Sequence, residues 1–442
     1  MDPSLRWGDG FRFARYSPSR MRIAIVGAGY SGTMAAVEAI RASPAADVVL
    51  IEKSGRFAAG AAYGTRNASH LLNVRARSMS ALADAPDDFA DWLAREGLGG
   101  SETFARRRDY ARYLAGISER SGARRVVGEA VGVEGQTLVL ASGERLDFDA
   151  LVLAGGNYPG RTPARLGIET VDDPWGPDGA EAIARLANEP GELLLLGTGL
   201  TMVDVALSLD DAGFQGRMIA VSRRGLVPRA HEEPSSPALE IPPPAGLLAL
   251  MRHVRGLRPW RAGVDSLRPH SIPLWRGFTA AERSRFLRHA RPWWDVHRHR
   301  IAPPVAARIA ALREAGRLEV LAGRVRQDGD RVTVSLRGGG EVRRRFAAAI
   351  NCTGPEGAVA RVEDPLVRQL LASGRARPDP LGAGLDVDER SHLIGANGLP
   401  APRLFAVGPP TRGAFWEIVA VPDIRNQVRD VAAVIALLGE RD

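Results

Sequence analysis

The chain has 442 residues, of which 45% are hydrophobic and 25% charged, and this composition excludes a mainly disordered, collagen-like or coiled-coil protein. No stretch reaches the roughly 18 apolar residues of a membrane span, and the single cysteine, Cys352, excludes both a disulfide-stapled fold and a redox-active cysteine pair. The net charge of +8 is spread along the chain as arginine, with Lys53 as the one lysine, so we expect anionic small molecules as partners, and neither nucleic acid nor a membrane.

Residues 1–20 contain glycine, proline, serine and arginine but no apolar core of a secretory signal. We expect a flexible tail here and a cytoplasmic protein. The ordered pattern begins with a β-branched run at residues 22–26, which is typical of a buried parallel strand. A helix rich in good helix formers follows over residues 33–40, and a second strand over residues 47–51.

A glycine-rich turn, GAGYSG, joins the first strand to its helix, and Glu52 ends the second strand. In a dinucleotide fold, Gly27 permits the tight turn, Gly29 lets a pyrophosphate approach the backbone, and Gly32 lets the helix pack on the strand. The helix N-terminus offers free N–H groups to phosphates, and Glu52 accepts hydrogen bonds from the adenosine ribose. Because its charge repels a 2′-phosphate, this site suits FAD or NAD. The alternative is a glycine-rich turn without a ligand.

A second unit of strand, glycine turn, helix and strand occupies residues 192–221. Gly197 and Gly199 form the turn, and Met202 stands where the first pattern has its third glycine. The spacing again indicates a helix N-terminus that faces a pyrophosphate. Two such sites in one chain indicate one resident and one visiting cofactor, with hydride passing from a nicotinamide to a flavin.

The second site differs from the first at the end of its second strand. Arg223 and Arg224 follow that strand in place of an acid, and arginines at this point suit the 2′-phosphate of NADP. The alternative is that both side chains are simply solvated. We expect FAD in the first site and NADPH in the second.

Further motifs are spread over residues 21–440: Gly60-Ala-Ala-Tyr63-Gly64, His70-Leu-Leu-Asn73-Val74, Asp88-Phe89-x-x-Trp92-Leu93, Ser222-Arg-Arg-Gly225, Pro228-Arg229-x-His231 and Trp293-Trp-Asp295-Val-His297-Arg-His299-Arg300. On these motifs the chain resembles the two-dinucleotide-binding-domain flavoproteins, and more narrowly the bacterial FAD/NAD(P)-binding proteins related to YdhS. The resemblance implies an α/β fold with two Rossmann-like dinucleotide-binding domains, in which the FAD domain is discontinuous and the NADP domain is inserted.

The expected domain boundaries follow from this resemblance. Residues 21–158 would form the first part of the FAD domain, residues 159–345 the NADP domain, and residues 346–442 the second part of the FAD domain. Residues 228–303 break the nucleotide pattern with histidines, tryptophans and prolines, so we expect a helical or loop insertion that covers the active site. Residues 318–345 are expected to form paired strands joined by a glycine turn.

The resemblance also implies which residues contact the cofactors. Gly155 and Gly354 would mark the two crossings between the domains, Gly408 would pass near the flavin pyrophosphate and ribityl chain, and a helix beginning at residues 413–417 would face the flavin ring. The residues expected to bind a cofactor are Gly27, Gly29, Tyr30, Ser31, Gly32, Glu52, Lys53, Tyr63, His70, Asn73, Gly155, Gly197, Gly199, Arg223, Arg224, Gly354, Gly408, Phe415 and Trp416.

Hydride transfer requires little from side chains, because the cofactor carries the chemistry. Asn73 is expected to contact the isoalloxazine or the nicotinamide, and a loop-capping role is the alternative. Asp295, His297 and His299 lie in a block of tryptophans and arginines that is either a catalytic pocket for a planar or anionic substrate or a structural core. The expected helical spacing does not place these histidines on one face, so no metal site is expected.

These features favour an NADPH-dependent flavoprotein monooxygenase, with molecular oxygen and a small-molecule substrate as its partners. The resemblance includes urate hydroxylases and so implies a small planar, nitrogen-containing substrate. The sequence lacks the FxGxxxHxxxW fingerprint of Baeyer–Villiger enzymes, so ketone oxygenation is not expected. The alternatives are a flavin reductase or dehydrogenase that uses an acceptor other than oxygen, and a non-catalytic FAD-binding protein.

Overall fold

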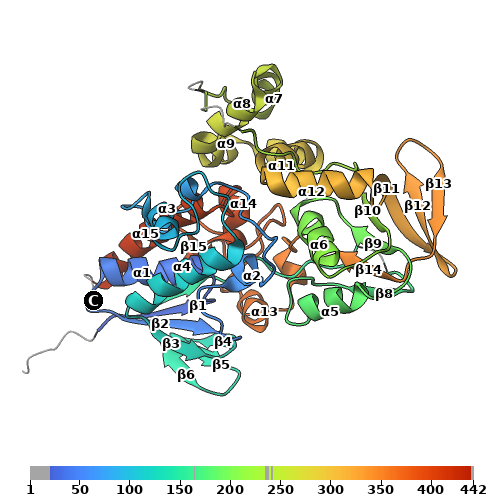
Figure 1. Ribbon diagram of the computed structural model, residues 1–442. Coiled ribbons are helices and arrows are strands. Elements are labelled where there is room, and N and C mark those ends of the chain that lie inside the picture. The colour runs from blue at the N-terminus through green and yellow to red at the C-terminus, as the bar shows by residue number, and fades with distance from the viewer. Residues whose placement is uncertain (1–19, 164, 234–237, 240–241, 440–442) are drawn as a thin grey trace, which may run out of the picture.

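The computed structural model describes residues 20–163, 165–233, 238–239 and 242–439, so the tail expected over residues 1–20 lies, except for Arg20, outside the described residues. The chain forms two β-sheet domains side by side, and a group of short helices lies against one side of the molecule (Figure 1). Among the described helices, none combines the length and the apolar character that crossing a membrane requires.

The first sheet has six strands in the order β15-β16-β7-β1-β2-β3. Its strands are β1 (Arg22–Val26), β2 (Asp47–Glu52), β3 (Arg124–Val127), β7 (Ala150–Leu153), β15 (His392–Ile394) and β16 (Pro400–Ala406). All neighbours pair in parallel except β15, which is antiparallel to β16. The central strands are covered on both faces, which is why β1 and β7 are unbroken apolar runs without polar alternation.

Helices from both ends of the chain cover this sheet. One face carries α1 (Tyr30–Ala42), α4 (Arg107–Arg120) and α15 (Val421–Gly439), and α1 and α15 pack against each other (Figure 1). Residues 22–158 and 359–435 therefore share one hydrophobic core. The remaining elements of this domain are α2 (Gly60–Tyr63), α3 (Asp88–Arg95), α13 (Pro365–Ala372), the one-turn α14 (Arg412–Phe415), and a small antiparallel sheet of β4 (Ala130–Glu134), β5 (Thr137–Leu140) and β6 (Arg145–Asp147).

The second sheet has seven strands in the order β13-β12-β11-β10-β9-β14-β8. Its strands are β8 (Glu169–Val171), β9 (Leu193–Leu196), β10 (Met218–Ser222), β11 (Leu318–Asp328), β12 (Arg331–Leu336), β13 (Glu341–Arg344) and β14 (Ala348–Asn351). The helices α5 (Gly179–Leu186), α6 (Leu200–Asp211) and α12 (Pro303–Glu314) belong to this domain. The paired strands expected over residues 318–345 are confirmed, because β11, β12 and β13 form successive antiparallel pairs.

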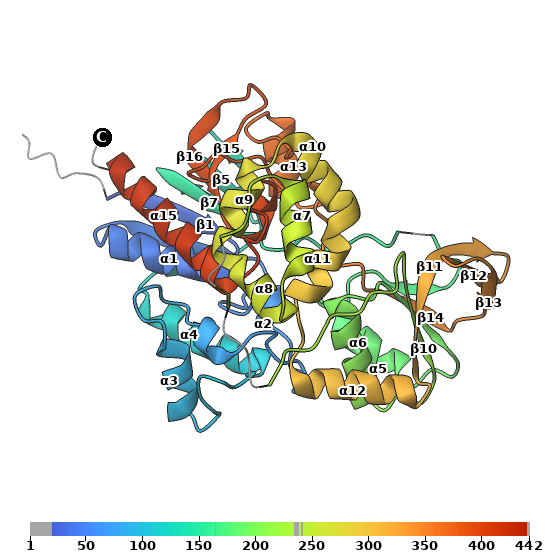
Figure 2. The ribbon, with the colours of Figure 1, turned by 90° about the horizontal axis from the view of Figure 1, so that it is seen from above.

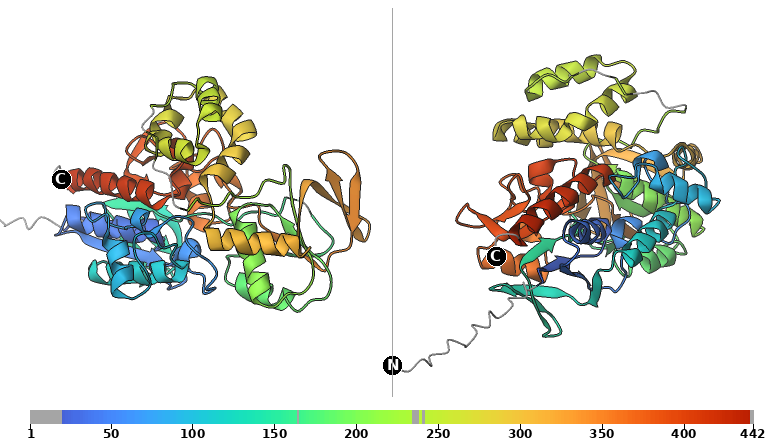
Figure 3. Two further views of the ribbon diagram at one scale, coloured as in Figure 1. Left: turned by 45° about the horizontal axis from the view of Figure 1, so that its top comes forward. Right: turned by 90° about the vertical axis from the view of Figure 1, so that its left-hand side faces the viewer.

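The insertion is helical, as expected. It contains α7 (Leu247–Gly256), α8 (Trp260–Ser266), α9 (Ser271–Gly277), α10 (Ala280–Arg285), a π-helical turn (Phe286–Ala290) and α11 (Arg291–Arg298). The Thr279 hydroxyl and the Glu282 carboxylate form a capping box that starts α10. Figures 2 and 3 show these helices beside α15 of the first domain, and α9 contacts α14.

Two chain crossings join the domains and lie next to each other. Glu356 N donates a hydrogen bond of 3.1 Å to Tyr158 O, and a Cβ on Gly160 would overlap the carbonyl oxygen of Gly354. The boundary expected between residues 345 and 346 is too early, because β14 pairs with β8 and β9 in the second sheet. A short apolar strand followed by a glycine does not reveal from sequence alone which of two similar sheets it joins.

A helix begins near the expected place at the carboxyl end of the first domain, but it is short. α14 is a single turn that ends at Phe415, Trp416 follows it with a φ of +36°, and the long helix α15 starts at Val421. The backbone of Trp416 is therefore strained for a residue with a side chain.

Candidate functional site

The two glycine turns have the same construction. Gly27 N donates a hydrogen bond of 2.9 Å to Ile51 O, and Gly197 N donates one of 2.8 Å to Val221 O. Their φ angles are +98° and +116°, values that glycine adopts without strain. Each turn thus joins its first strand to the following helix and is hydrogen-bonded to the adjacent second strand, at the carboxyl edge of the sheet where dinucleotides bind in this fold.

Close backbone packing makes glycine necessary in both turns. A Cβ on Gly27 would overlap the carbonyl oxygen of Ala154, and a Cβ on Gly197 would overlap that of Cys352. A Cβ on Gly32 would overlap the carbonyl oxygen of Gly27 itself. The third glycine of the first turn therefore permits close contact between α1 and the turn, as predicted for a dinucleotide site.

The helix that follows each turn has an open N-terminus. Gly29 and Gly199 are the N-cap residues of α1 and α6, neither helix has a side-chain cap, and neither has an acidic residue in its first turn. A Cβ on Gly199 would meet nothing within 4 Å, and one on Gly29 would meet only Gly60 Cα at 3.5 Å. Both helices leave N–H groups and space at their N-termini, and these features fit a pyrophosphate group.

Glu52 lies against the first turn. Its Oε2 accepts a hydrogen bond of 3.0 Å from Ala28 N, and its Oε1 accepts bonds of 3.0 and 2.8 Å from Ser54 N and Oγ. The carboxylate is thereby held at the end of β2, within the region where an adenosine ribose lies in this fold. The neighbouring Lys53 points elsewhere, because its Nζ forms an exposed ion pair of 3.5 Å with Glu129.

The second turn carries the two predicted arginines on a fixed loop. The Thr198 Oγ1 lies 2.8 Å from the Ser222 Oγ and donates a bond of 2.5 Å to Leu226 O. These bonds hold the loop from residue 222 to residue 226 over the glycine turn. Within the described part of the chain, Arg223 and Arg224 have no hydrogen bond or ion pair, so both guanidinium groups are free to bind an anion.

The carboxyl-terminal part of the first domain reaches the first turn. A Cβ on Gly408, whose φ is +73°, would overlap the Ser31 hydroxyl oxygen. Gly408 N donates a bond of 2.7 Å to Gln427 Oε1, and Tyr30 Oη donates one of 3.3 Å to Val421 O. Gly408, Tyr30 and Ser31 are therefore brought together, as the resemblance implies, while the structure itself shows no ligand contact for them.

His70 lies at the junction between the two domains. Its Nδ1 is 2.8 Å from Thr65 Oγ1, and its Nε2 is 3.0 Å from both Asp204 O and Ser208 Oγ on α6. Both ring nitrogens thus have protein partners. Tyr63 packs edge-on against Tyr110 with the ring centroids 4.7 Å apart. A cofactor contact by either residue stays a prediction.

Asn73 belongs to a loop that is tied to the start of the insertion. His231 Nε2 donates a hydrogen bond of 2.8 Å to Asn73 O. Burial lowers the pKa of His231 to about 4, so its ring is neutral near pH 7 and keeps its proton on Nε2 for this bond. The bond uses only the backbone of Asn73, which leaves its half-buried side-chain amide available.

The block at residues 293–300 meets the segment after α14. Glu417 is 1% exposed; its Oε1 accepts a bond of 2.8 Å from Trp294 Nε1, and its Oε2 lies 3.3 Å from Arg298 Nε. Burial opposes ionisation, but His299, Arg298 and Trp294 together hold the pKa of Glu417 below its ordinary value. His299 Nε2 is 4.0 Å from Glu417 Oε1.

The other two predicted catalytic residues of this block are placed differently. Asp295 Oδ2 forms an ion pair of 3.3 Å with Arg291 Nε, one turn earlier on the same helix. His297 Nδ1 donates a bond of 2.7 Å to Trp293 O. The structure therefore brings His299 to Glu417, whereas the hydrogen-bond and ion-pair partners described for Asp295 and His297 lie on their own helix. Among the residues described, no group of three or more histidine, cysteine or acidic side chains is placed to hold a metal ion.

Buried polar atoms without a hydrogen-bond partner gather where these segments meet. In the part of the chain that the structure describes, they include Asp295 Oδ1, Arg412 Nε, Trp416 Nε1 and Arg425 Nε. Most buried polar groups in proteins are paired, so such a concentration is typical of a site that binds a polar ligand. Together with the glycine turns, this region fits a bound flavin.

Sequence reasoning missed Glu417, Arg298 and Trp294 as a unit. The motifs containing them were recognised, but Trp294 and Glu417 are 123 positions apart, and no local pattern pairs them. The tie between His231 and Asn73 was missed for the same reason, since the two residues are 158 positions apart.

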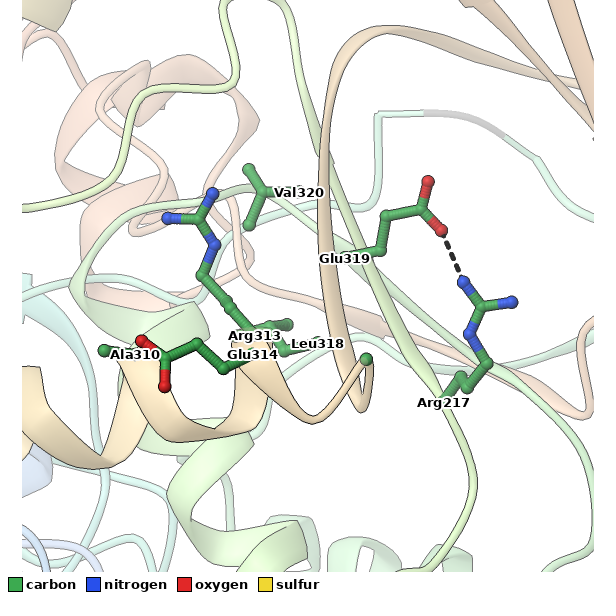
Figure 4. A pocket seen from close by; sticks show the side chains of 8 residues that line it. Arg217, Ala310, Arg313, Glu314, Leu318, Glu319 and Val320 are labelled. Carbon is green, nitrogen blue, oxygen red and sulfur yellow. Dashed lines mark hydrogen bonds and ion pairs between the residues drawn. The ribbon is translucent and has the colours of Figure 1, made fainter.

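A separate depression of about 520 Å³ lies between the end of α12 and the start of β10 and β11 (Figure 4). Figure 4 shows Arg217 paired with Glu319 at its edge, with an Nη2–Oε2 distance of 2.8 Å. It faces the amino ends of these strands, whereas dinucleotides bind beyond the carboxyl ends. It is therefore separate from the cofactor site.

Residues 24–158 match a family model described as FAD-NAD(P)-binding. This part of the chain is an FAD/NAD(P)-binding domain. The matched residues include the first glycine turn, β2 and β7, the strand that precedes the first crossing between the domains. The expected cofactor class and the expected α/β fold with Rossmann-like domains are confirmed. A search of curated proteins found no match to this chain.

Solved structures show the same fold over nearly the whole chain. The Kutzneria sp. 744 ornithine N-hydroxylase is 14% identical, with 94% of this chain and 99% of that chain covered and a TM-score of 0.65. The ornithine hydroxylase of Pseudomonas aeruginosa is 17% identical, with coverages of 95% and 99% and a TM-score of 0.61. The bacillithiol disulfide reductase of Bacillus cereus is 14% identical, with coverages of 96% and 100% and a TM-score of 0.53. At these identities the likeness establishes the fold alone.

Proposed function

We propose that the protein is an FAD- and NADPH-dependent monooxygenase that hydroxylates a small planar, nitrogen-containing molecule. The observation that carries the proposal is the pair of equivalent glycine turns, one followed by a fixed acid and the other by two free arginines. The acid disfavours a 2′-phosphate and the arginines favour one. FAD therefore belongs at the first turn and NADPH at the second.

Several side chains have defined tasks in this proposal. Glu52 accepts hydrogen bonds from the FAD ribose, and the N-termini of α1 and α6 bind the two pyrophosphates through backbone N–H groups. Arg223 and Arg224 pair with the 2′-phosphate of NADPH. Bound FAD supplies the redox chemistry, by accepting hydride and passing reducing equivalents to oxygen.

Residues near the two glycine turns hold neighbouring side chains in position or carry a proton. His231 fixes the Asn73 loop through a backbone bond, so that the Asn73 amide is oriented toward the cofactors. Trp294 and Arg298 keep Glu417 ionised and in place, and His299 beside it holds or moves a proton. Asp295, paired with Arg291 one turn earlier, has a positioning role on the same helix, and His297 is left for substrate contact.

A reductase that passes electrons to another acceptor is the second candidate, because one structural neighbour is a disulfide reductase. Cys352 argues against a dithiol pathway in this chain: the thiol is buried, and burial raises its pKa far above the ordinary range. The buried, tryptophan-lined surroundings of Glu417 favour the monooxygenase, since oxygen transfer requires exclusion of water.

The deciding experiment is an anaerobic mixture of the FAD-loaded protein with NADPH, followed by the visible flavin absorption. We expect the flavin bands to bleach, and to bleach more slowly with NADH. Admission of oxygen then separates the candidates: a monooxygenase consumes oxygen with little free hydrogen peroxide once substrate is present. Failure of NADPH to bleach the flavin, with and without substrate, contradicts both enzyme proposals and leaves a non-catalytic FAD-binding protein.

A further inference from the structure

The helical insertion encloses an apolar cavity of about 370 Å³, a size that suits a small organic molecule. We propose that this cavity binds the substrate and that the substrate is a planar aromatic or heteroaromatic molecule, not a cationic amine. This inference rests on the proposed function, because it names the substrate class of the same enzyme. Its evidence is the chemistry of the cavity wall and the contact of that wall with the FAD domain.

Aromatic rings dominate the wall. Five tryptophans line the cavity, namely Trp260, Trp275, Trp293, Trp294 and Trp416, and Phe278 and Phe286 accompany them. Indole rings offer flat, polarisable faces, and they bind other rings by stacking or by edge-to-face contact better than they bind alkyl chains. The wall therefore selects for a flat aromatic ligand.

Few polar groups line the cavity, and among the lining residues that the structure describes none is an acid. The polar lining residues are Arg255, Ser271 and His297. The Ser271 hydroxyl is already used, because it donates a bond of 3.1 Å to Leu267 O. An ammonium group placed here meets no carboxylate from the described wall residues. Its burial is therefore unfavourable, because no ion pair compensates for the lost hydration. An alkylamine such as ornithine is thereby disfavoured.

His297 supplies a directional polar contact. Its Nδ1 donates to Trp293 O at 2.7 Å, and with the ring proton on Nδ1 the other nitrogen, Nε2, is left as an acceptor. Trp260 meets the imidazole edge-on, with the ring centroids 4.9 Å apart, and so fixes its plane. A ring N–H or a phenolic hydroxyl on the substrate matches this acceptor. Arg255, which is exposed at the edge of the cavity, accommodates an anionic substituent on such a ring.

One wall of the cavity belongs to the FAD domain. Trp416 stacks on Trp275 with centroids 4.8 Å apart and an interplanar angle of 25°, and Phe286 meets it edge-on at 5.2 Å. Trp416 is 3% exposed, and its Nε1 has no hydrogen-bond partner within the described chain. An unpaired buried donor on a cavity wall requires an acceptor, and a bound heteroaromatic ligand provides one. Trp416 lies in the segment after Gly408, which packs against Ser31 of α1, so one stretch of chain contributes to both the cavity wall and the first glycine turn.

The test uses the full-length FAD-loaded protein without NADPH, so that binding is measured apart from turnover. The probes for isothermal titration calorimetry are indole, indole-3-carboxylate, L-ornithine and n-octanol. A Met251→Trp variant fills the cavity from α7, and Leu248→Trp on the same helix serves as the matched control, because Leu248 is 63% exposed and is not part of the cavity wall. Thermal melting and FAD content verify that both variants are folded.

We expect an indole compound to bind wild type and Leu248→Trp equally, and to bind Met251→Trp at least about tenfold more weakly, a change of ~1.4 kcal/mol. L-ornithine should not bind. The inference is overturned if neither indole compound saturates the protein, if Met251→Trp binds them unchanged, or if ornithine or octanol binds as tightly as indole. Should the indoles bind as expected while NADPH fails to bleach the flavin, the cavity assignment stands and the monooxygenase proposal falls.

Discussion

Arg107 on α4 donates a hydrogen bond of 2.8 Å from Nη2 to Asp204 Oδ2 on α6 and so joins the two dinucleotide domains. Both side chains are largely buried, at 16% and 9% exposure. Asp204 O also bonds to His70, so one turn of α6 carries two links to the FAD domain. The helix whose N-terminus we propose to face NADPH is therefore held against the domain that we propose to bind FAD.

Removal of this link should loosen the domain junction. Arg107→Ala leaves the buried Asp204 carboxylate unpaired, and we expect a loss of about 3–5 kcal/mol in the free energy of unfolding. Arg112→Ala on the same helix is the control, because its pair with Glu96 is exposed at 57% and 38%; it should cost less than about 1 kcal/mol. Thermal melting measures both, and equal melting temperatures for the two variants would contradict a structural role of the junction.

The two glycines of the second turn should respond differently to alanine. Gly199→Ala meets no atom within 4 Å, so the protein should fold normally, while the added methyl group obstructs the pyrophosphate and raises the KM for NADPH by about tenfold. Gly197→Ala combines a φ of +116° with overlap on Cys352 O and should destabilise the fold itself. Steady-state kinetics and thermal melting separate the two effects. A destabilised Gly199→Ala protein with an unchanged KM would refute this division of roles.

The free arginines should determine the choice between NADPH and NADH. The Arg223→Ala/Arg224→Ala double variant should raise the KM for NADPH by at least about 10- to 100-fold, since the loss of even one charge-assisted hydrogen bond costs about 1.5–3 kcal/mol. The KM for NADH should stay unchanged. Arg313→Ala, an exposed arginine of α12 at the other edge of the sheet, is the control. Equal losses with both nucleotides would show that the arginines do not bind the 2′-phosphate.

Stability should fall in mild acid because of His231. Its pKa in the folded protein is lowered to about 4, so between the ordinary value of 6.5 and that value the unfolded chain binds a proton that the folded protein excludes. The stabilisation is complete above pH 6.5 and is lost as the pH falls toward 4. Between pH 7.5 and pH 5, the free energy of unfolding should decrease less for His231→Gln than for wild type. We expect the two decreases to differ by about 1 kcal/mol.

Thermal melting at the two pH values measures this difference. His289→Gln, at an exposed histidine, is the control and should behave as wild type does. A His231→Gln variant with the same acid sensitivity as wild type would assign the effect to other groups, of which the buried His70 is the first to examine, since burial lowers its pKa as well.

The features that sequence predicted are local ones. Gly27, Gly29, Gly32 and Glu52 occupy about thirty consecutive residues in a strand–turn–helix–strand unit, and such a unit specifies its own geometry. The structure places each of them accordingly. The second turn was predicted on the same grounds, and Met202 at its third position is buried in the core of the second domain without disturbing the turn.

The features that sequence did not predict depend on contacts between distant segments. The sheet to which β14 belongs, the short α14 and the surroundings of Glu417 are each decided by packing partners more than a hundred positions away. Trp275 Nε1, for instance, donates to Gly413 O at 2.8 Å and thereby fixes where α14 lies. The sequence predicts a helical or loop insertion, but it does not predict the cavity that this insertion forms.

The paired crossings at Tyr158 and Glu356 have an evolutionary consequence. Because the chain leaves the first domain and returns to it at neighbouring points, the second domain is a cassette whose two ends lie together. Such a domain can be replaced by another nucleotide-binding domain without a change in the chain path of the first domain. The replacement must keep the surface of α6 that Arg107 contacts. Preference for the electron donor can therefore diverge in this architecture independently of the flavin site.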